Sequence, residues 1–277
     1  MIRMKLVTLY EKLLFDQMGP LAMDIHDSAT KGFGAAAATY VRGRPDYPPE
    51  TLSWLRETLG LGPGRAVLEV GAGTGKFIPM LRQSGARLMA LEPVEAMRNQ
   101  IALTQGDVDV LAGEAAAIPL PDNAVDAIVC AQAFHWFATP AVLQEFRRVL
   151  APGGMLGLIW NVRDETVPWV AALSEITDPL EAGTPRYRSG AWRRVFPAEG
   201  FASVGELNVA HAHTGTPEDV IIRRTLSVSF IAAQPEAIQQ EVEAKVRALI
   251  SRTPALQNRE DIAFPYQTRM FTYRKCG

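Results

Sequence analysis

The chain has 277 residues, and its 28 Lys and Arg almost balance its 30 Asp and Glu, which leaves a net charge of −2 at pH 7. This balance gives no overall positive field, so no nucleic-acid partner is expected. The apolar stretches of residues 1–23 are short and interrupted by charges, so we expect no membrane span or signal peptide there and a cytoplasmic location. Cys130 and Cys276 make no disulfide framework, and no Cys/His spacing indicates a metal site.

A segment rich in proline and aromatic residues, 38–50, precedes a helix predicted from Thr51 to Leu59. One interpretation is a connector whose aromatic rings pack on the core. The other is a segment that shapes a ligand site, with Tyr40 and Arg44 as substrate-binding residues.

The next element is an apolar strand at 66–70 that runs into a glycine-rich turn, and a helix is predicted at 74–84. Alternate glycines permit a sharp turn and let a ligand approach the backbone closely, and the helix that follows offers free N–H groups. Nucleotide-like cofactors bind in this way at the carboxyl edge of parallel sheets. The residues expected to line such a site are Glu69, Gly71, Ala72, Gly73, Thr74 and Gly75.

The spacing of the glycines separates three classes of cofactor. A phosphate-binding loop is excluded, since Val70 stands where its first glycine belongs and Phe77 where its hydroxyl belongs. A dinucleotide fingerprint needs a glycine at Lys76, so it is weakened without being excluded. The remaining pattern, Glu69-x-Gly-x-Gly-x-Gly, resembles motif I of the class I S-adenosylmethionine-dependent methyltransferases. That resemblance implies S-adenosylmethionine as cofactor and S-adenosylhomocysteine as product.

A second short strand, 87–91, ends at Glu92, about twenty residues beyond the glycine turn. A carboxylate at that distance can accept hydrogen bonds from both hydroxyls of a ribose. The alternative is that Glu92 only caps a solvated strand end. Pro93 suits the first position of the helix predicted at 93–104, and Met97 on that helix is also expected at the cofactor site.

A third strand, 108–111, leads to Gly113, Glu114 and Ala115. The family resemblance places these residues at the adenine. Relatives often carry a second acid at the next position, whereas this chain has Ala116.

The fourth strand, 125–131, should bring four further residues to the carboxyl edge of the sheet, near the methionine end of the cofactor. They are Ala131, Gln132, Ala133 and Trp136. His135 lies among them, either as a general base or as a residue that shapes the site and forms hydrogen bonds. His135-Trp-Phe, together with Leu-Ala-Pro-Gly-Gly at 150–154, resembles the small-molecule branch that contains trans-aconitate methyltransferase.

The alternation of strands and helices predicts an α/β fold, a Rossmann-like doubly wound sheet that is mostly parallel. A fifth strand is expected near 155–161 after a helix at 139–150. The family resemblance adds a C-terminal antiparallel hairpin, for which the candidates are 202–214 and 262–275. A helical insertion at 217–226 and 235–252 should lie between them, with an apolar stripe that belongs to the core.

The expected organisation is an N-terminal extension, 1–27, followed by a single methyltransferase domain, 28–277. Within the domain we expect a lid and first helix at 38–60, a cofactor-binding core at 64–162, and accessory helices with the final hairpin at 163–277.

The acceptor site is less well marked. Trp160 and Arg163 follow the fifth strand as candidate substrate-binding residues, and the arginines between 186 and 194 could grip a carboxylate or contact RNA. The expected function is methyl transfer to a carboxylate or hydroxyl of a small-molecule acceptor, by a monomer or a homodimer. Two alternatives are a nicotinamide-dependent oxidoreductase, whose catalytic residues we do not find, and a non-catalytic nucleoside-binding protein, against which the intact glycines and Glu92 argue.

Overall fold

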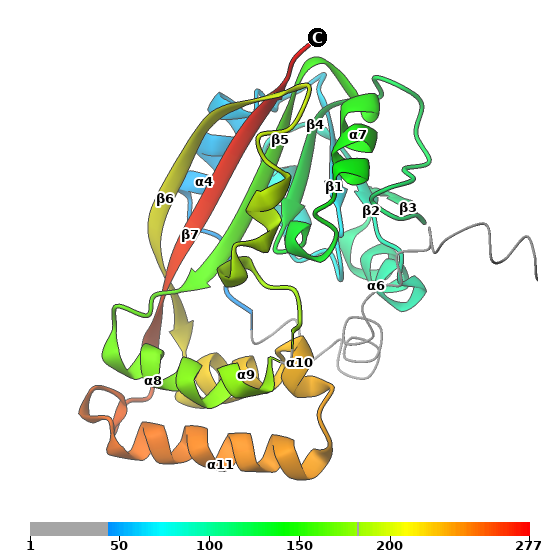
Figure 1. Ribbon diagram of the computed structural model, residues 1–277. Helices are drawn as coiled ribbons and strands as arrows, with labels where there is room; N and C mark the ends of the chain where they lie inside the picture. Colours follow the sequence, from blue (N-terminus) through cyan, green and yellow to red (C-terminus); the bar gives the residue numbers. More distant parts are fainter. Residues whose placement is uncertain (1–43, 182) are drawn as a thin grey trace, which may run out of the picture.

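The computed structural model describes residues 44–181 and 183–277, so the extension at 1–27 and Tyr40 lie outside the described residues. One seven-stranded sheet, with the order β3-β2-β1-β4-β5-β7-β6, forms the centre of this part of the chain (Figure 1). Its strands are β1 (Ala66–Val70), β2 (Arg87–Leu91), β3 (Asp109–Leu111), β4 (Val125–Ala131), β5 (Leu150–Arg163), β6 (Phe201–Gly215) and β7 (Ile262–Lys275).

Strands β1 to β5 pair in parallel, and β7 pairs antiparallel with both β5 and β6. The chain order reverses beside β1, which has β2 on one side and β4 on the other. Ligands of open α/β sheets bind at such a switch point, outside the carboxyl ends of the strands. The predicted fold class, a mostly parallel doubly wound sheet with a C-terminal antiparallel hairpin, is confirmed.

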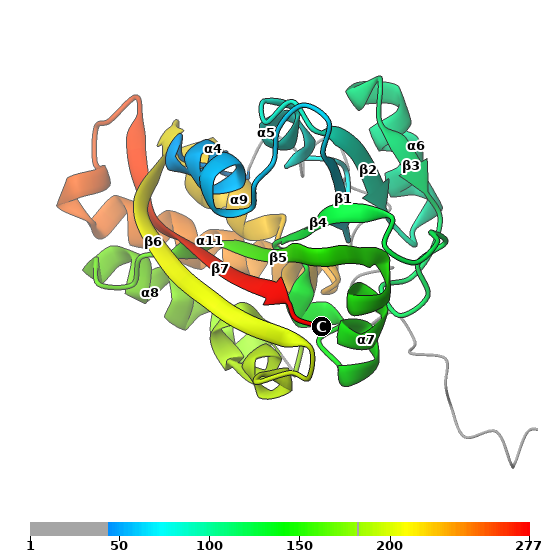
Figure 2. The same cartoon turned by 90° about the horizontal axis from the view of Figure 1, so that it is seen from above.

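Helices cover both faces of the sheet at its parallel centre, so β1, β2 and β4 are buried on both sides, whereas the edge strand β6 is largely exposed. Successive residues of β1 show this, because Val67 packs with the helices of one face and Leu68 with those of the other. Figure 2 shows α4 and α5 on one side of the sheet and α7 on the other. The first face carries α4 (Glu50–Ser53), a π-helical turn (Trp54–Thr58), α5 (Ile78–Arg82) and α6 (Glu95–Gln105), and the second carries α7 (Pro140–Val149).

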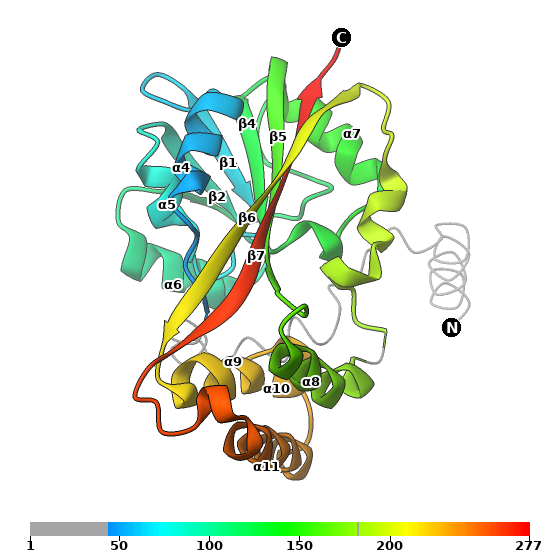
Figure 3. The ribbon, with the colours of Figure 1, turned by 90° about the vertical axis from the view of Figure 1, so that its left-hand side faces the viewer.

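The helical insertion forms a separate layer beyond the end of β5, with its own core (Figure 3). Val242, Val246 and Leu249 of the predicted apolar stripe are buried in that core, and Ile250 packs against it. The layer consists of α8 (Pro168–Thr177), a π-helical turn (Glu218–Arg223), α9 (Arg224–Leu226), α10 (Ser229–Ala232) and α11 (Glu236–Arg252).

Two predicted boundaries differ from the structure. The helix expected at 74–84 is helical only at Ile78–Arg82, because Gly73 and Gly75 have positive φ angles of 58° and 80° and keep the preceding residues in a turn. The fifth strand begins at Leu150, which pairs with Val125 ahead of a register shift. The Pro-Gly-Gly stretch therefore belongs to β5, and the strand is longer than the pattern at 155–161 predicted.

A buried hydrogen bond ties the first helical segment to the last strand. Trp54 Nε1 donates to Thr272 Oγ1 at 2.9 Å, and the two residues are 3% and 2% exposed. Trp54→Phe and Thr272→Val should each lower the free energy of unfolding by about 1–3 kcal/mol, since each leaves a buried polar partner unsatisfied. The double variant should lose less than the sum, because neither partner then remains. Urea unfolding of all four proteins measures this coupling, and additive losses would contradict it.

Candidate functional site

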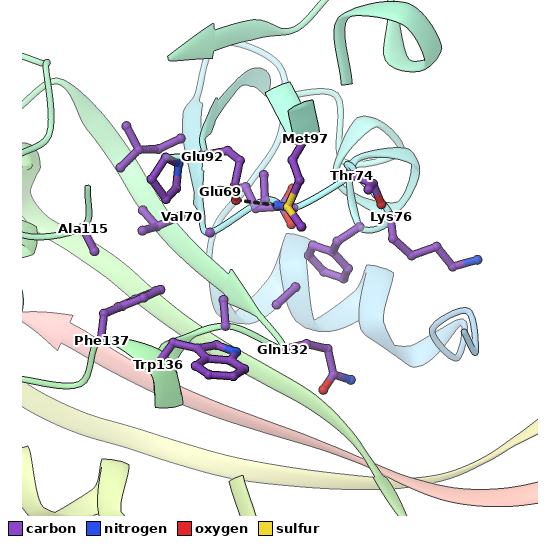
Figure 4. A pocket seen from close by; sticks show the side chains of 18 of the residues that line it. Glu69, Val70, Thr74, Lys76, Glu92, Met97, Ala115, Gln132, Trp136 and Phe137 are labelled. Atoms are coloured by element: carbon purple, nitrogen blue, oxygen red, sulfur yellow. Dashed lines mark hydrogen bonds between the residues drawn. The ribbon is translucent and has the colours of Figure 1, made fainter. Parts of the chain in front are cut away.

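A pocket of about 320 Å³ opens at the switch point, against the carboxyl ends of β1, β2 and β4. We call it the first pocket. Glu69 and Glu92 lie on one side of it and Gln132 and Trp136 on the other (Figure 4). The residues predicted for the cofactor that line it are Glu69, Gly71, Ala72, Gly73, Thr74, Glu92, Pro93, Met97, Gly113, Glu114, Ala115, Ala131, Gln132, Ala133 and Trp136.

The glycine turn forms the wall nearest to β1. Gly71 has φ +72°, and a Cβ there would lie 2.8 Å from the Cβ of Ala133. The backbone of the turn can therefore approach the loop after β4 only as glycine. Gly75, in contrast, does not line the pocket. A Cβ on it would meet Ile78, Gln105 and Ile101 within 3.2 Å, so the sequence-based placement of Gly75 in the cofactor site is replaced by a packing role against α6.

Glu69 is the most deeply buried acid of the site, with 1% exposure. Burial, assisted by the charge of Glu92, raises its pKa to about 8. Its Oε2 atom is buried and has no hydrogen-bond partner within the described residues. A buried acceptor of this kind is costly unless a ligand donor reaches it, so Glu69 is suited to a cationic, N–H-bearing group.

Glu92 is held by the backbone. Gly73 N donates to its Oε2 at 2.9 Å and Val94 N to its Oε1 at 3.0 Å. Burial raises the pKa of this carboxyl, while the two N–H donors and the charge of Arg98 act in the opposite direction. Each oxygen keeps a lone pair free, so both hydroxyls of a ribose could donate to Glu92. The interpretation as a solvated strand cap does not fit a side chain that is 5% exposed.

The loop after β4 completes the first pocket. Gln132 has φ +59°, a conformation that costs a residue other than glycine about 1–3 kcal/mol and that clusters at functional sites. Its Nε2 contacts the carbonyl of Asn161 on β5 at 3.4 Å. This contact joins the loop after β4 to β5, and Asn161 also lines the pocket.

A second pocket, of about 190 Å³, adjoins the first. Five residues line both pockets and form what we call the junction: Arg44, Gln132, Trp136, Asn161 and Arg224. The wall of the second pocket carries five arginines and only two carboxylates, Glu165 and Asp178, both paired with Arg188. The remaining arginines are Arg44, Arg163, Arg186 and Arg224.

His135 lies in the second pocket, not in the first. Trp160 Nε1 donates to its Nδ1 at 3.1 Å, so the neutral ring carries its proton on Nε2. Burial and the charges of Arg186 and Arg44 lower the pKa of His135 to about 3. The ring is thus neutral near pH 7 and has a donor, Nε2–H, free for a ligand.

Within residues 44–181 and 183–277, no cluster of three or more His, Cys, Asp or Glu could hold a metal ion. No helix in that part of the chain is long and apolar enough to cross a membrane.

Comparison with known proteins decides the family. The family described as "Methyltransferase domain" matches residues 68–158. The methyltransferase-like protein C25B8.10 of Schizosaccharomyces pombe is 36% identical over 248 residues, which cover 88% of this chain and 96% of that protein. The methyltransferase Rv3342 of Mycobacterium tuberculosis is 37% identical over 240 residues, 85% of this chain and 92% of that protein. This chain belongs to the class I S-adenosylmethionine-dependent methyltransferases.

Solved structures agree on the methyltransferase fold. A type II methyltransferase from Anaeromyxobacter dehalogenans superimposes with a TM-score of 0.57 at 24% identity, over 83% of this chain and 96% of that one. A methyltransferase from Bacillus halodurans gives a TM-score of 0.54 at 18% identity, over 82% of this chain and 100% of that one. Similarities at this level of identity support the fold alone. The domain boundaries predicted at residues 27 and 28 stay a prediction.

Three of the predicted acceptor residues lie together in the structure, and the fourth lies outside the described residues. Arg44, Trp160 and Arg163 meet in the second pocket beside His135, while Tyr40 lies outside the described residues. Of the arginines between 186 and 194, only Arg186 and Arg188 line that pocket. Residues with polar side chains that sequence reasoning missed there include Asn161, Arg224 and Tyr266.

Two glycine variants of the methyltransferase distinguish the steric effect of a side chain at the glycine turn from the strain of a left-handed backbone. Gly71→Ala and Gly73→Ala both force a side chain into a left-handed conformation, which costs about 1–2 kcal/mol. Only Gly71→Ala also places its Cβ against Ala133, whereas a Cβ at Gly73 meets nothing within 4 Å. Overpacking adds about 1–3 kcal/mol, so Gly71→Ala should be the less stable protein by that amount. Urea unfolding checks this order, and equal losses would show that the approach to Ala133 does not constrain the turn.

Proposed function

We propose that this methyltransferase transfers the methyl group of S-adenosylmethionine to a carboxylate oxygen of a small-molecule acceptor. One observation carries the proposal: the pocket at motif I shares five lining residues with a second pocket, whose wall carries five arginines and two carboxylates. The first pocket would hold the cofactor and the second the acceptor, with the methyl group at the junction. Guanidinium groups bind carboxylates through paired, charge-assisted hydrogen bonds.

The residues of the first pocket fit the cofactor. The unpartnered Oε2 of Glu69 would accept a hydrogen bond from the ammonium group of the methionine moiety. Glu92 would accept from the ribose hydroxyls, because its backbone partners already hold both oxygens in place. Glu114 and Ala115 would border the adenine, as in the family. The backbone around Gly71 would approach the cofactor closely, where any side chain would collide with Ala133.

The chemistry asks the chain chiefly for alignment. Bound S-adenosylmethionine supplies an electrophilic methyl carbon on a sulfonium, and in-line attack by a carboxylate oxygen needs no proton transfer. Holding the two reactants in line supplies roughly 7–11 kcal/mol of barrier reduction. Arg163 and Arg186 would fix the acceptor, and the junction residues Gln132 and Trp136 would set the direction of approach. The segment at 44–47 lies against the first pocket and helps to exclude water.

The environment of His135 favours a carboxylate over a hydroxyl. A hydroxyl acceptor needs a general base, but the Nδ1 of His135 already accepts from Trp160 and the lowered pKa makes the ring a weak base. We therefore assign His135 the alternative role, a donor whose Nε2–H orients the acceptor. Similarity to malonyl-[acyl-carrier protein] O-methyltransferase of Serratia marcescens, 36% over 102 residues, which cover 35% of this chain and 40% of that protein, also supports oxygen as the methyl-accepting atom.

The remaining expectations stay predictions. They are a close relation to trans-aconitate methyltransferase, a monomer or homodimer, a cytoplasmic location and no nucleic-acid partner. The named methyltransferase relatives argue against a nicotinamide-dependent oxidoreductase. The unpartnered Oε2 of Glu69 argues against a protein of this fold that has lost its ligand.

Cofactor binding should depend on pH through Glu69. The ammonium group of the cofactor favours the carboxylate form of Glu69. Because the pKa of Glu69 is raised to about 8, this side chain is protonated near pH 7 and must release its proton when the cofactor binds. The affinity for S-adenosylhomocysteine should therefore rise as pH increases towards 8, by up to about tenfold per pH unit, and then level off. Isothermal titration in two buffers of different ionisation enthalpy measures both the affinity and the released proton.

Glu69→Gln is the matched variant for this titration, since it keeps the shape of the side chain and cannot ionise. Its affinity should be lower at pH 8 and should not change with pH. Glu92→Gln should keep a rise of affinity with pH, but the rise should level off at a lower pH, because the charge of Glu92 helps to raise the pKa of Glu69. Failure of S-adenosylhomocysteine to bind the wild-type chain at any pH would overturn the proposed function. If the affinity of Glu69→Gln changes with pH as much as that of the wild type, the proton released on binding comes from another group.

The donor role of His135 has a kinetic consequence. Loss of a general base costs about 10²–10⁴-fold in turnover, whereas loss of one orienting donor to a carboxylate should cost about tenfold or less. His135→Ala should therefore keep most single-turnover activity with methyl-labelled cofactor and the best acceptor from a panel of small carboxylic acids. Trp160→Phe, which removes the donor to Nδ1 together with part of a buried ring, is the variant for comparison. A hundredfold loss in His135→Ala, together with a wild-type rate that titrates near the ordinary pKa of histidine, would restore the base assignment.

A further inference from the structure

Arg224 lies between the two pockets, whereas the arginine next to it in the sequence lies at the surface. It begins α9 in the helical layer, far from motif I in the chain, yet it lines both the first and the second pocket. Arg223, the residue before it, is 48% exposed, and its guanidinium lies 2.8 Å from Asp219 and 4.0 Å from Glu218. Of these two adjacent arginines, only Arg224 points its charge at the junction.

The charge of Arg224 is not neutralised by the chain. Its Nε and Nη1 atoms are buried and have no hydrogen-bond partner, and no carboxylate within residues 44–181 and 183–277 forms an ion pair with it. Two of its neighbours are cationic: the charge of Arg224 contributes to the lowered pKa values of Arg163 and Arg186. An unpaired guanidinium among like charges is a costly arrangement unless an anion joins it.

The two forms of the cofactor differ in charge where Arg224 lies. S-adenosylmethionine carries a positive sulfonium, and S-adenosylhomocysteine has a neutral thioether. In the proposed function the methyl group would face the second pocket, which would bring the sulfonium near the junction. Like charges repel strongly in a partly dehydrated site, where the effective dielectric constant is far below that of water. With the second pocket empty, Arg224 should therefore disfavour the methyl donor and not the product.

We propose that Arg224 couples the binding of donor and acceptor, so that the cationic donor binds tightly only when an anion occupies the second pocket. This inference rests on the proposed function and adds an electrostatic condition to it. The acceptor carboxylate would lie between the guanidinium and the sulfonium and be attracted to both. Arg224 is thus a positioning residue whose effect passes through the anion.

The reaction itself removes the charges that hold the complex together. A lone pair of the carboxylate oxygen forms the new O–C bond, and the C–S pair leaves with sulfur. An anion and a sulfonium become a neutral ester and a neutral thioether, and no proton moves. Arg224 loses its anionic partner in that step, so the neutral ester is held less tightly than the acid. The same residue thereby favours binding of the substrate pair and release of the ester.

The test compares a cationic and a neutral ligand without turnover. Sinefungin carries an ammonium in place of the sulfonium and cannot donate a methyl group, and S-adenosylhomocysteine is the neutral counterpart. Titration of each into the purified chain, with and without sodium malonate at constant ionic strength, measures the coupling. Malonate should tighten sinefungin binding by about tenfold or more and S-adenosylhomocysteine binding by about threefold or less. By linkage, sinefungin should tighten malonate binding by the same factor.

Three variants locate the effect. Arg224→Gln should bind sinefungin more tightly than the wild type without malonate and should lose the difference between the two ligands. Arg224→Lys keeps the charge and should retain the difference, and Arg223→Gln is the matched surface control. Circular dichroism and thermal unfolding confirm that each variant is folded.

The outcomes separate this inference from the proposed function. Equal effects of malonate on both ligands, or an unchanged difference in folded Arg224→Gln, would overturn the coupling while leaving the proposed function in place. If neither nucleoside binds the wild-type chain, the proposed function fails and the coupling with it. If Arg223→Gln also abolishes the difference between the effects of malonate on the two ligands, the effect comes from the overall charge of the helical layer. That result would overturn the role of Arg224.

Discussion

Two carboxylates buried side by side at the ends of β1 and β2 are the constraint on which the site depends. The parallel register that pairs Val70 with Leu91 brings Glu69 and Glu92 to the same edge of the sheet. Both acids are buried there, and the chain provides them with unequal numbers of hydrogen-bond donors. Glu92 receives two backbone N–H groups, while one oxygen of Glu69 receives none. The glycine turn serves this arrangement, because Gly73 donates its N–H to Glu92 from a left-handed conformation, φ +58°, that glycine adopts without strain.

The second pocket has the opposite charge, and the separation of charges gives the two pockets their chemistry. Acids gather at the strand ends of the first pocket, and arginines gather where the helical layer closes over β5. The net charge of −2 for the whole chain conceals this division. The cationic methyl donor and the anionic acceptor that we propose match the two fields. Arg44 and Arg224 line both pockets, so the coupling that we propose would act at this junction.

Much of the first pocket could be predicted from the sequence because local spacing determines it. An acid at a strand end, glycines at alternate positions and a second acid at the next strand end specify their own geometry once the strands pair in parallel. Gly75 shows the limit of such spacing. It continues the alternation of Gly71 and Gly73, but the chain has already turned there, so Gly75 faces Ile78 and Ile101 and not the pocket. The left-handed conformation of Gln132 also left no sign in the sequence, since glutamine rarely adopts it.

The second pocket could not be predicted in the same way because no local pattern specifies it. Asn161 comes from β5, Arg224 from α9 and Tyr266 from β7, and they meet only because the antiparallel hairpin carries the helical layer back over the sheet edge. Arg223 and Arg224 are the same residue type at adjacent positions, yet one pairs with acids at the surface and the other faces the junction. A rotation of about 100° per residue along the helix separates the two environments. The second pocket, which we propose holds the acceptor, therefore depends on long-range packing, and its arginines come together only through the fold.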